Sequence, residues 1–483
     1  MTLAVGGIST VDPATGETIA RFLYTTPDEL ERILAKSRLT QEKWARSTVD
    51  ERIEGIERLA ASLAAHRERL AAQIVREMGK PITQARAEID KCVTACDYYA
   101  NHLAAILAPR PVDVRPDTAE VHLRPLGVIF AILPWNYPWW QVIRAMLPAI
   151  GAGNVVVLKH ADSVTGCALT IADLLCESFA EDVLRAVVLP ADRASDVIAD
   201  HRIAAVTFTG SERVGALVAQ AAGASLKKCV LELGGSDPFI VFDDADIAAA
   251  AEAAVRSRYI NNGQSCIAAK RLIVQRSVRD ELVEAMCERV GMLRVGDPTD
   301  PSTDIGPLAR FDLLRTLESQ RARAIADGAR TLAEAPTPGG PGAWFAPTLM
   351  EVDVTSPLFT EETFGPLGAL TVFDHPEQAI LLANESQYGL SSSIWTTDID
   401  RARQLAGRIE AGSVFINTIS VSDPRLPVGG VKSSGYGREL AEWGVTEFAN
   451  LQAVRAGMET GATSSPTLST DQRVAFPPSG GGR

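Results

Sequence analysis

The sequence predicts an α/β protein with two lobes, the first of them built on a parallel, doubly wound sheet. Between residues 128 and 207, short apolar runs alternate with helical patterns, which is typical of such a sheet. A second α/β alternation begins at Val230. The chain has 483 residues, more than one hydrophobic core usually holds, so we expect two large lobes with separate interiors.

The chain before this sheet is expected to begin with two edge strands and continue as helices. Residues 5–24 alternate short apolar runs with turn signals, and residues 26–107 show apolar spacing of three and four, which predicts roughly three helices. The stretch Glu-Met-Gly-Lys-Pro at 77–81 marks one break between them. Residues 111–126 contain two β-forming segments around a turn, and such a hairpin needs a partner to pack on or pair with.

The remaining elements follow from the same patterns. In the first lobe we expect strands near 128–133, 155–158, 186–189 and 204–207, and helices near 140–150, 165–179 and 194–199. In the second lobe we expect helices near 247–257 and 278–290, strands near 271–274 and 369–373, and mainly loops with one helix across 296–342. Residues 459–483 are rich in Thr, Ser, Pro and Gly, which predicts a disordered tail.

Charge, hydropathy and cysteine usage argue against several classes of protein. The net charge of −13 disfavours a nucleic-acid partner, because phosphate contacts need clustered lysine and arginine. The chain has neither an apolar run approaching the ~20 residues of a membrane helix nor a signal-peptide pattern, so we expect a cytoplasmic protein with no membrane partner. The seven cysteines are odd in number and scattered, which fits neither a disulfide framework nor a metal site.

One cysteine lies in a stretch that favours a turn. Residues 259–267 read Tyr-Ile-Asn-Asn-Gly-Gln-Ser-Cys-Ile, and the small and amide-bearing residues before Cys266 bring it out of a helical approach. A thiol is a nucleophile only as the thiolate, which the backbone N–H groups of such a turn favour. On this stretch alone, a buried and unreactive thiol is an equal alternative.

Two strand ends in the first lobe have features of a nucleotide site. The strand 204–208 runs into Thr-Gly-Ser with Gly210 and Ser211 before a helix, where a glycine lets the backbone approach a phosphate. The strand 155–158 ends at Lys159, and Asp162 can hydrogen-bond a ribose diol while it repels a 2′-phosphate. A plain tight turn and a surface ion pair are the alternatives.

Two further residues suit chemistry at a carbonyl group. Asn136 lies in Pro-Trp-Asn-Tyr-Pro, where two prolines fix the backbone and the amide can donate to a developing oxyanion. Glu232 lies in Leu-Glu-Leu-Gly-Gly, where burial would raise the pKa of its carboxyl and suit it to general-base work. A rigid aromatic turn and a surface glutamate at a strand end are the alternatives.

Together these motifs resemble the NAD(P)-dependent aldehyde dehydrogenase superfamily. Pro-Trp-Asn-Tyr-Pro, Phe-Thr-Gly-Ser, Leu-Glu-Leu-Gly-Gly, Asn-Gly-Gln-Ser-Cys and, from residue 361, Glu-Glu-Thr-Phe-Gly-Pro occur in the family's order, and the resemblance covers about residues 8–455. It implies an aldehyde dehydrogenase-like fold that forms a homodimer or homotetramer. The implied parts are a Rossmann-type dinucleotide-binding domain (1–110 and 127–235), an α/β catalytic domain (236–430) and a small β oligomerisation element (111–126 and 431–458).

The resemblance also implies residue roles and a reaction. Cys266 corresponds to the nucleophile, Glu232 to the base that activates the hydrolytic water, and Asn136 to the oxyanion donor. The implied cofactor contacts are Trp135, Lys159, Asp162, Gly210, Ser211, Glu362 and Phe364. The implied reaction is oxidation of a small-molecule aldehyde to the acid through a cysteine thiohemiacetal and a thioester, with hydride transfer to NAD(P).

Within the superfamily the chain resembles bacterial succinate-semialdehyde dehydrogenases, notably at residues 158–161, 233–239 and 422–427. This resemblance implies that Arg144 and Ser422 hold the substrate carboxylate, for which the arginine fork is well suited. Ile260 stands where some relatives carry a second arginine, which weakens the case for a four-carbon acid. The alternatives are another ω-carboxy aldehyde such as glutarate semialdehyde, a neutral aldehyde, or a non-catalytic protein on this fold.

Two positions near the motifs depart from close relatives. Several relatives that prefer NADP have serine in place of Asp162, whose carboxylate repels a 2′-phosphate, so we expect a preference for NAD with NADP as the alternative. Ala268 excludes a redox switch that some relatives build with a second cysteine two residues after the nucleophile.

Overall fold

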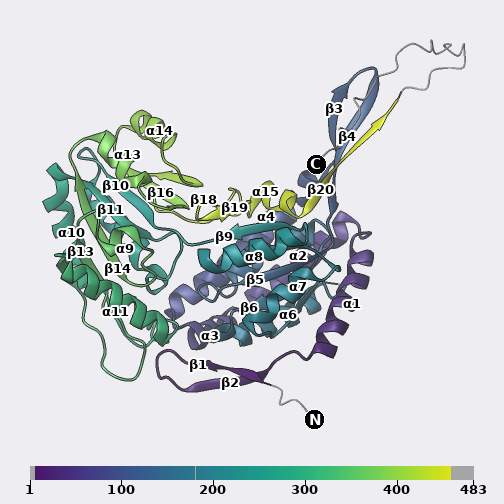
Figure 1. The fold of residues 1–483 in the computed structure, drawn as a ribbon, viewed down its shortest axis with the longest axis horizontal. Coiled ribbons are helices and arrows are strands. Elements are labelled where there is room, and N and C mark those ends of the chain that lie inside the picture. The colour runs from purple at the N-terminus through teal and green to yellow at the C-terminus, as the bar shows by residue number, and fades with distance from the viewer. Residues whose placement is uncertain (1–5, 180, 458–483) are drawn as a thin grey trace, which may run out of the picture.

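The structure is a computed structural model that describes residues 6–179 and 181–457. The tail predicted at 459–483 lies outside these residues. Two lobes lie side by side, each with helices around a sheet, and a narrow ribbon of strands extends from the body of the molecule (Figure 1). The α/β prediction is confirmed, because both large sheets consist mostly of parallel strands.

The N-terminal part packs four helices beside the first sheet, where the sequence analysis expected three. After the antiparallel pair β1 (Gly7–Val11) and β2 (Thr18–Leu23) come α1 (Pro27–Trp44), α2 (Val49–Ala65), α3 (Arg67–Met78) and α4 (Ile82–Leu107). Thr26 and Thr48 each begin a helix with a capping box, in which the threonine hydroxyl and a glutamate satisfy free N–H groups. The helical run breaks at His66, between α2 and α3. Apolar spacing alone did not reveal this break.

The first large sheet has five parallel strands and one antiparallel edge strand. In spatial order these are β19 (Gly435–Tyr436), β9 (Lys228–Glu232), β8 (Ile203–Thr209), β5 (Val128–Leu133), β6 (Val155–His160) and β7 (Leu184–Ala186). The connecting helices are α5 (Trp140–Gly151), α6 (Thr165–Ser178), α7 (Ala194–Ala199) and α8 (Glu212–Ala224). The chain runs from β5 outward to β7 and then returns to β8, so the topological switch point lies between β5 and β8.

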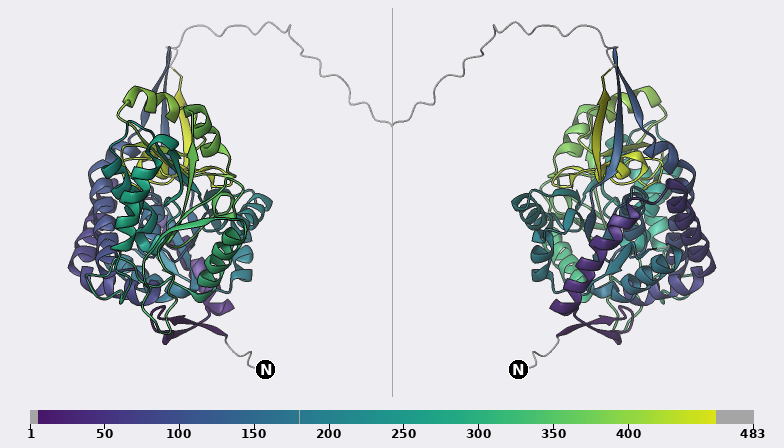
Figure 2. Two further views of the ribbon diagram at one scale, coloured as in Figure 1. Left: turned by 90° about the vertical axis from the view of Figure 1, so that its left-hand side faces the viewer. Right: turned by 90° about the vertical axis from the view of Figure 1, so that its right-hand side faces the viewer.

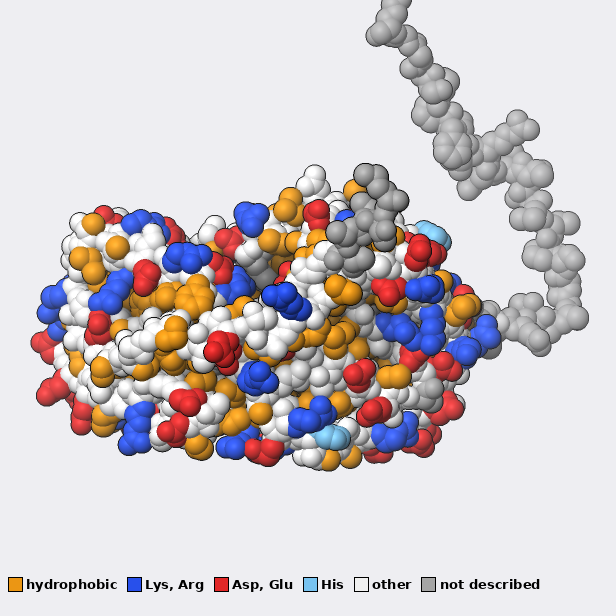
Figure 3. All heavy atoms as spheres, turned by 90° about the horizontal axis from the view of Figure 1, so that it is seen from below, with side chains coloured by type: hydrophobic (Ala, Val, Ile, Leu, Met, Phe, Trp, Pro, Cys, Tyr) orange, Lys and Arg blue, Asp and Glu red, His pale blue; other side chains and the backbone are white. Residues whose placement is uncertain are grey.

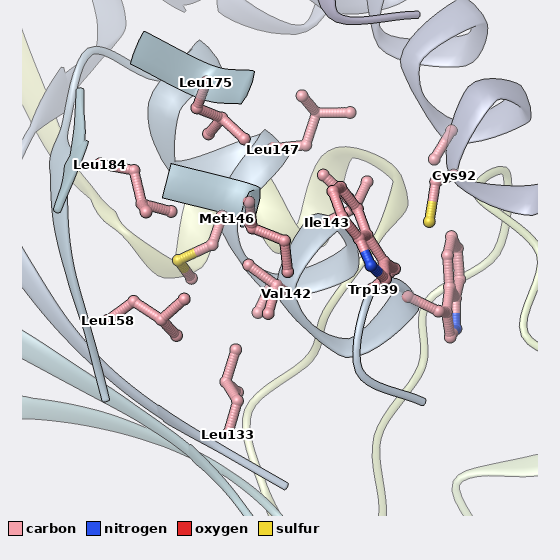
Figure 4. Close-up of a cluster of buried hydrophobic side chains, with 14 of the residues drawn as sticks. Cys92, Leu133, Trp139, Val142, Ile143, Met146, Leu147, Leu158, Leu175 and Leu184 are labelled. Atoms are coloured by element: carbon pink, nitrogen blue, oxygen red, sulfur yellow. The ribbon is translucent and has the colours of Figure 1, made fainter. Parts of the chain in front are cut away.

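The core of this lobe surrounds α5, which is buried along its whole length. Figure 4 shows Val142, Ile143, Met146 and Leu147 of this helix between leucines of the sheet strands on one side and Cys92 and Trp139 on the other. A helix that is apolar all round packs between layers. This packing fixes α5 and therefore the direction in which its polar residues point.

The second large sheet also has one antiparallel edge strand. In spatial order its strands are β12 (Arg330–Glu334), β13 (Thr348–Glu351), β14 (Leu367–Phe373), β11 (Ala269–Gln275), β10 (Asp237–Val241), β16 (Ser391–Trp395) and β17 (Ser413–Ile416). Its helices are α9 (Ile247–Tyr259), α10 (Arg279–Gly291), α11 (Phe311–Ala326), α12 (Pro357–Thr360), α13 (Pro376–Asn384) and α14 (Ile399–Ala406). The segment 296–342 thus holds β12 in addition to the one helix expected there.

The chain changes from the first sheet to the second directly after Glu232. The run that begins at Val230, expected to open the second lobe, in fact ends β9 of the first sheet and then forms β10 of the second. Glu232 therefore lies at the boundary between the lobes. Apolar residues continue across this boundary, which is why the sequence pattern did not separate the two strands.

The hairpin expected at 111–126 pairs with a strand from the other end of the chain. β3 (Arg110–Val114), β4 (Asp117–Pro125) and β20 (Ala449–Ala456) form an antiparallel sheet that extends beyond the lobes (Figure 2). Of the described residues of the segment predicted at 431–458, which end at 457, those of β20 alone belong to this sheet. Before β20 come β18 (Val431–Lys432), which pairs with β15 (Tyr388–Gly389), then β19, which pairs with β9, and α15 (Ala441–Glu447).

The surface mixes charges of both signs. On the face that Figure 3 shows, acidic and basic side chains alternate with apolar ones. Within residues 6–179 and 181–457, every helix is too short or too polar to cross a lipid bilayer.

Candidate active site

Cys266 follows a turn whose backbone conformation few residue types adopt. The 3₁₀ turn η3 (Ile260–Gly263) leads from α9 toward β11, and Asn261, Asn262 and Gly263 all have positive φ, at 59°, 56° and 70°. Asparagine and glycine adopt this left-handed region most readily. A Cβ added to Gly263 would lie 2.4 Å from the backbone of Gly365. The Asn-Asn-Gly sequence is therefore a backbone requirement of the loop that presents Cys266.

Side-chain amides bind this loop to the loop after β5. The Nδ2 of Asn261 donates to the carbonyl oxygens of Asn136 and Gln264, both at 2.9 Å, and the Nδ2 of Asn136 donates to the Gln264 carbonyl at 3.1 Å. Asn262 donates to the carbonyls of Gly79 and Pro307. The predicted oxyanion donor and the predicted nucleophile are thus held on adjoining loops, although 128 residues separate Asn136 from its acceptor.

Two adjoining cavities meet at Cys266. One has a volume of about 480 Å³ and lies between α4, α5, the cysteine loop and the loop at 419–422. The other, of about 420 Å³, has Glu232 in its wall. Cys266, Arg144 and Ser422 line both cavities. The structure therefore brings together the predicted nucleophile, base and carboxylate-binding residues.

Glu232 is buried at the end of β9, with 2% of its surface exposed. Burial raises the pKa of its carboxyl to about 8, and Arg144 partly opposes this shift. The two side chains approach to 3.5 Å between Arg144 Nη2 and Glu232 Oε2. At neutral pH the Glu232 carboxyl therefore holds its proton in most molecules and is close to the range in which a general base works.

Arg144 is buried on α5, with 3% of its surface exposed, and is not a helix-surface arginine. Besides Glu232 it forms an ion pair with Glu439, whose pKa is raised by burial. Glu439 was not among the residues that sequence reasoning selected, and the sequence around it has no motif that indicates burial. The Arg144 guanidinium thus lies beside two buried carboxyl groups, while its Nε and Nη2 atoms are buried without a hydrogen-bond partner among the described residues.

The environment of Cys266 favours the neutral thiol at rest. Burial raises the pKa of the thiol to about 11, while the charges of Arg144 and Lys270 act to lower it. Lys270 is fully buried, donates to the Cys266 carbonyl oxygen at 3.2 Å and forms an ion pair with Glu362. Sequence reasoning did not select Lys270. Its only signal is a lysine inside the apolar strand β11.

A third cavity, of about 830 Å³, opens at the carboxyl ends of β5, β6 and β8. Pro134, Lys159 and Gly210 line it, as do residues of α8. Such an edge at a switch point is where doubly wound sheets bind nucleotides. The residues present fit a dinucleotide, because the Thr209 hydroxyl is buried without a partner among the described residues and a Cβ on Gly210 would lie 2.5 Å from the Phe208 ring.

The other predicted cofactor residues lie in two places. Ser211 is the N-cap residue of α8, and Asp162 begins a 3₁₀ turn (η1, Asp162–Val164) about half exposed, 3.5 Å from the Lys159 ammonium. Neither residue lines the 830 Å³ cavity itself. Asp162 is therefore placed beside the lysine rather than in the wall of the cavity.

The other predicted cofactor residues are Trp135, Glu362 and Phe364, and Lys270 connects Glu362 to the Cys266 carbonyl. The Trp135 and Phe364 rings meet edge to face at 5.7 Å between centroids. The Glu362 carboxylate accepts from the Gly235 N–H at 3.0 Å and from Lys270. Lys270, which also contacts the Cys266 carbonyl, thus connects this group to the cysteine loop.

A dinucleotide-type cavity at the switch point, together with a cysteine loop that lines a second cavity, is typical of an NAD(P)-dependent oxidoreductase. The sequence model of the aldehyde dehydrogenase family matches residues 4–454, and the chain belongs to this family. It is therefore an enzyme that oxidises aldehydes.

Similar proteins and structures cover nearly the whole chain. A succinate semialdehyde dehydrogenase [NAD(P)+], Sad, of Escherichia coli K12 is 45% identical over 92% of this chain and 96% of that protein. A succinate-semialdehyde dehydrogenase [NADP(+)] of Mycobacterium leprae is 42% identical over 92% and 99%. Among solved structures, Gox0499 has a TM-score of 0.92 with 38% identity, covering 93% of this chain and 100% of that one. A succinic semialdehyde dehydrogenase of Streptococcus pyogenes with NADP+ has a TM-score of 0.90 with 35% identity, covering 92% and 99%.

Proposed function

We propose that the protein oxidises succinate semialdehyde to succinate, with Cys266 as nucleophile. The observation that carries this proposal is the 480 Å³ cavity, whose wall contains Cys266 together with two cationic side chains, Lys91 and Arg144, and the Ser422 hydroxyl. Cationic side chains in the same cavity as the nucleophile favour an aldehyde that carries a carboxylate. The relatives named for this substrate in E. coli and M. leprae support the same choice.

In the first half of the proposed reaction, the Cys266 thiol gives its proton to solvent water, and the thiolate sulfur bonds to the aldehyde carbon. The negative charge moves to the former carbonyl oxygen. The Asn136 amide, which already donates one N–H to Gln264, offers its second N–H to this oxygen, beside the Cys266 backbone N–H. Bound NAD(P) supplies the hydride acceptor that makes oxidation of the sulfur adduct to a thioester possible.

In the second half, Glu232 as carboxylate removes a proton from water, which attacks the thioester. The tetrahedral adduct collapses with loss of the Cys266 thiolate and releases the acid. The cavity that Cys266 and Glu232 share has room for this water. The raised pKa of Glu232 makes the carboxyl a stronger base than an exposed glutamate.

For the cofactor we propose a preference for NAD over NADP. Asp162 lies 3.5 Å from Lys159, so the lysine charge nearest the expected adenosine ribose is already paired with a carboxylate. A 2′-phosphate would meet that carboxylate, whereas a ribose hydroxyl can donate to it. We propose Lys159, Gly210 and Ser211 for the adenosine and pyrophosphate parts, and Trp135, Glu362 and Phe364 for the nicotinamide side.

We propose that the protein assembles as a homodimer or homotetramer through the sheet of β3, β4 and β20. The outer strands β3 and β20 each pair with β4 on one edge, and their other edges pair with no strand of the described residues. The two strands expose Val112, Leu451 and Val454. An exposed edge with apolar side chains favours pairing with another chain. Light scattering after gel filtration measures the resulting mass.

The proposed function is tested by steady-state rates of NAD reduction with succinate semialdehyde and with butanal, which has the same number of carbons and no charge. We expect kcat/KM for succinate semialdehyde to exceed that for butanal at least about tenfold, because a hydrogen bond to a charged group is stronger than a contact with a neutral one. Cys266→Ser serves as the inactive control. Equal values for the two aldehydes would contradict the proposal.

A second candidate substrate is a longer ω-carboxy aldehyde such as glutarate semialdehyde. The observation that favours it is the size of the cavity, about 480 Å³, with the apolar residues Trp140 and Ile260 in its wall. Rates across a series of semialdehydes with increasing chain length separate these candidates. A maximum at five carbons or more would replace succinate semialdehyde.

A further inference from the structure

A buried lysine in contact with the cysteine loop has no role in the reaction described above. Lys270 is the second residue of β11, and its side chain is fully buried. Its ammonium donates to the backbone oxygens of Gly235 and, at 3.2 Å, of Cys266, and it forms a hydrogen-bonded ion pair with Glu362. These acceptors come from three separate segments of the chain, which meet at this one nitrogen.

The three contacts require the charged form of Lys270. An ammonium has three N–H groups, whereas a neutral amine has two and would direct its lone pair at the third acceptor oxygen. A buried ammonium also needs a counter-charge, which the Glu362 carboxylate supplies. A positive charge is therefore fixed at the backbone of the predicted nucleophile.

Two carboxyl groups close to Lys270 differ in their charge. The Glu362 carboxylate accepts from the ammonium and, at 3.0 Å, from the Gly235 N–H, so it shares the lysine charge directly. Asp237 of β10 is buried, and burial raises the pKa of its carboxyl to about 8, although Lys270 opposes this shift. At neutral pH, Asp237 is therefore largely protonated, and Glu362 is the main competitor for the charge of Lys270.

Charged side chains from four elements act on the Cys266 thiol. Burial of the thiol raises its pKa, and the charges of Arg144 on α5 and Lys270 on β11 lower it. Glu232 of β9 and Asp237 of β10 raise it when they are ionised. Arg144 lies beside Glu232, while Lys270 in addition holds the Cys266 backbone by a hydrogen bond. Lys270 thus acts on both the position and the charge of the nucleophile.

We propose that Lys270 is a positioning residue that holds the backbone of Cys266 and favours its thiolate, and that Glu362 competes for the same ammonium. This inference rests on the proposed role of Cys266 as the nucleophile and is independent of which aldehyde is oxidised. It requires opposite changes at the thiol. Loss of the Lys270 charge should make the thiol less acidic, and loss of the Glu362 charge should make it more acidic.

The test is the rate at which iodoacetamide alkylates Cys266 in the full-length protein before NAD or aldehyde is added. The thiolate sulfur displaces iodide, so at a pH below the thiol pKa the rate follows the fraction of thiolate. Because that pKa is about 11, measurements between about pH 7.5 and 9.5 lie in this range. The peptide that contains Cys266 is quantified by mass spectrometry, since Cys176 is also exposed to the reagent.

Lys270→Met should lower the alkylation rate about tenfold, equal to a rise of about one unit in the thiol pKa, because methionine keeps an unbranched side chain without a charge. Lys270→Arg, which keeps the charge and N–H donors, should restore most of the rate. Glu362→Gln, which removes the competing carboxylate, should raise the rate about threefold. The Glu362 side chain is partly exposed, so this variant tests the inference even if Lys270→Met does not fold.

Lys228→Met is the matched control. Lys228 on β9 also pairs with a glutamate, at 2.9 Å from Glu447, but its side chain is exposed. The same loss of charge at this site should change the Cys266 rate less than about 1.5-fold, since an exposed charge is screened by solvent. Cys176, whose thiol donates to Asp182, is the internal reference and should react at one rate in all variants.

Three outcomes decide against this role of Lys270. An unchanged Cys266 rate in Lys270→Met would overturn the inference, as would an equal loss in Lys228→Met. A rate that does not rise in Glu362→Gln would also contradict it, because the ammonium would then not be shared. Failure of the proposed function is distinguishable from these results. It appears in the wild type as equal kcat/KM for succinate semialdehyde and butanal, whereas the alkylation involves no aldehyde.

Discussion

The proposed cofactor cavity and the proposed aldehyde cavity of this enzyme are built in different ways. The 830 Å³ cavity lies at the carboxyl ends of three neighbouring parallel strands, and the residues from those strands and the following turns are close in sequence to the strands themselves. The 480 Å³ cavity instead joins α4, α5, the cysteine loop and the loop at 419–422, which are far apart in the sequence.

The two cavities also differ in where their polar groups come from. In the cofactor cavity they come from strand ends and the turns or helices that follow, such as Lys159, Gly210 and Arg213. In the aldehyde cavity they include buried ionisable side chains that depend on partners from other elements. Arg144, for example, depends on Glu232 and Glu439. Substitutions on the aldehyde side should therefore change protonation states, and those on the cofactor side should change cofactor affinity.

The largest effect is expected from Glu232→Gln. The amide keeps the shape of the side chain but cannot accept the proton of water, so hydrolysis of the thioester should slow about 10²- to 10⁴-fold while acylation of Cys266 continues. Stopped-flow absorbance should show a burst of about one reduced cofactor per active site before the slow steady state. A variant without a burst and without steady-state turnover would place Glu232 in the first half of the reaction instead.

The pH dependence of the wild type tests the same residue. Because the pKa of Glu232 is raised to about 8, the carboxyl is protonated and inactive as a base below that pH. When hydrolysis limits the rate, kcat should fall about tenfold for each pH unit below 8 and level off above it. Glu232→Gln should lack this dependence. A wild-type profile that is flat between pH 6 and 9 would contradict a base with a raised pKa.

Arg144→Met should reduce activity on every aldehyde. Removal of the guanidinium leaves Glu232 and Glu439 without their buried counter-charge, so the pKa of Glu232 should rise further and kcat at pH 7 should fall about tenfold or more. Stability should fall by about 3–5 kcal/mol in urea unfolding, as for other broken buried pairs. A loss confined to succinate semialdehyde would instead show that Arg144 binds the substrate.

On the cofactor side, Gly210→Ala should raise the cofactor KM about tenfold. The added Cβ would lie 2.5 Å from the Phe208 ring, so either the ring or the turn must move within the cavity. The KM for the aldehyde at saturating cofactor should stay unchanged. Gly223→Ala on α8 is the matched control, because a Cβ there meets nothing within 4 Å. Similar kinetics for both variants would exclude Gly210 from the cofactor site.

The smallest effect is expected from Asp162→Ser. Loss of the carboxylate frees Lys159 for a 2′-phosphate, so the ratio of kcat/KM for NADP to that for NAD should rise, by about three- to tenfold. Asp173→Ser, an equal charge change at an exposed site on α6, should leave the ratio unchanged. An unchanged ratio in Asp162→Ser would remove the basis of the NAD preference.

Several features were predictable from the sequence because they depend on neighbouring residues. The alternation of apolar runs and helical patterns predicted the first sheet, and the turn residues Asn261, Asn262 and Gly263 predicted the loop that presents Cys266. Local chemistry also determined that Glu232, among apolar residues, would have a raised pKa once buried. Such properties follow from backbone preference and hydrophobic pattern over a few residues.

Other features were decided only by the tertiary structure. The hydrophobic pattern does not show that β9 belongs to the first sheet, since apolar residues continue across the boundary into β10. Nor does it show that Glu439 balances Arg144 or that Lys91 reaches Ser422, because the energy of a buried charge depends on partners from distant segments. The sequence by itself therefore determined the fold class and predicted the reacting groups. Long-range packing decided which ionisable side chains lie together around Cys266.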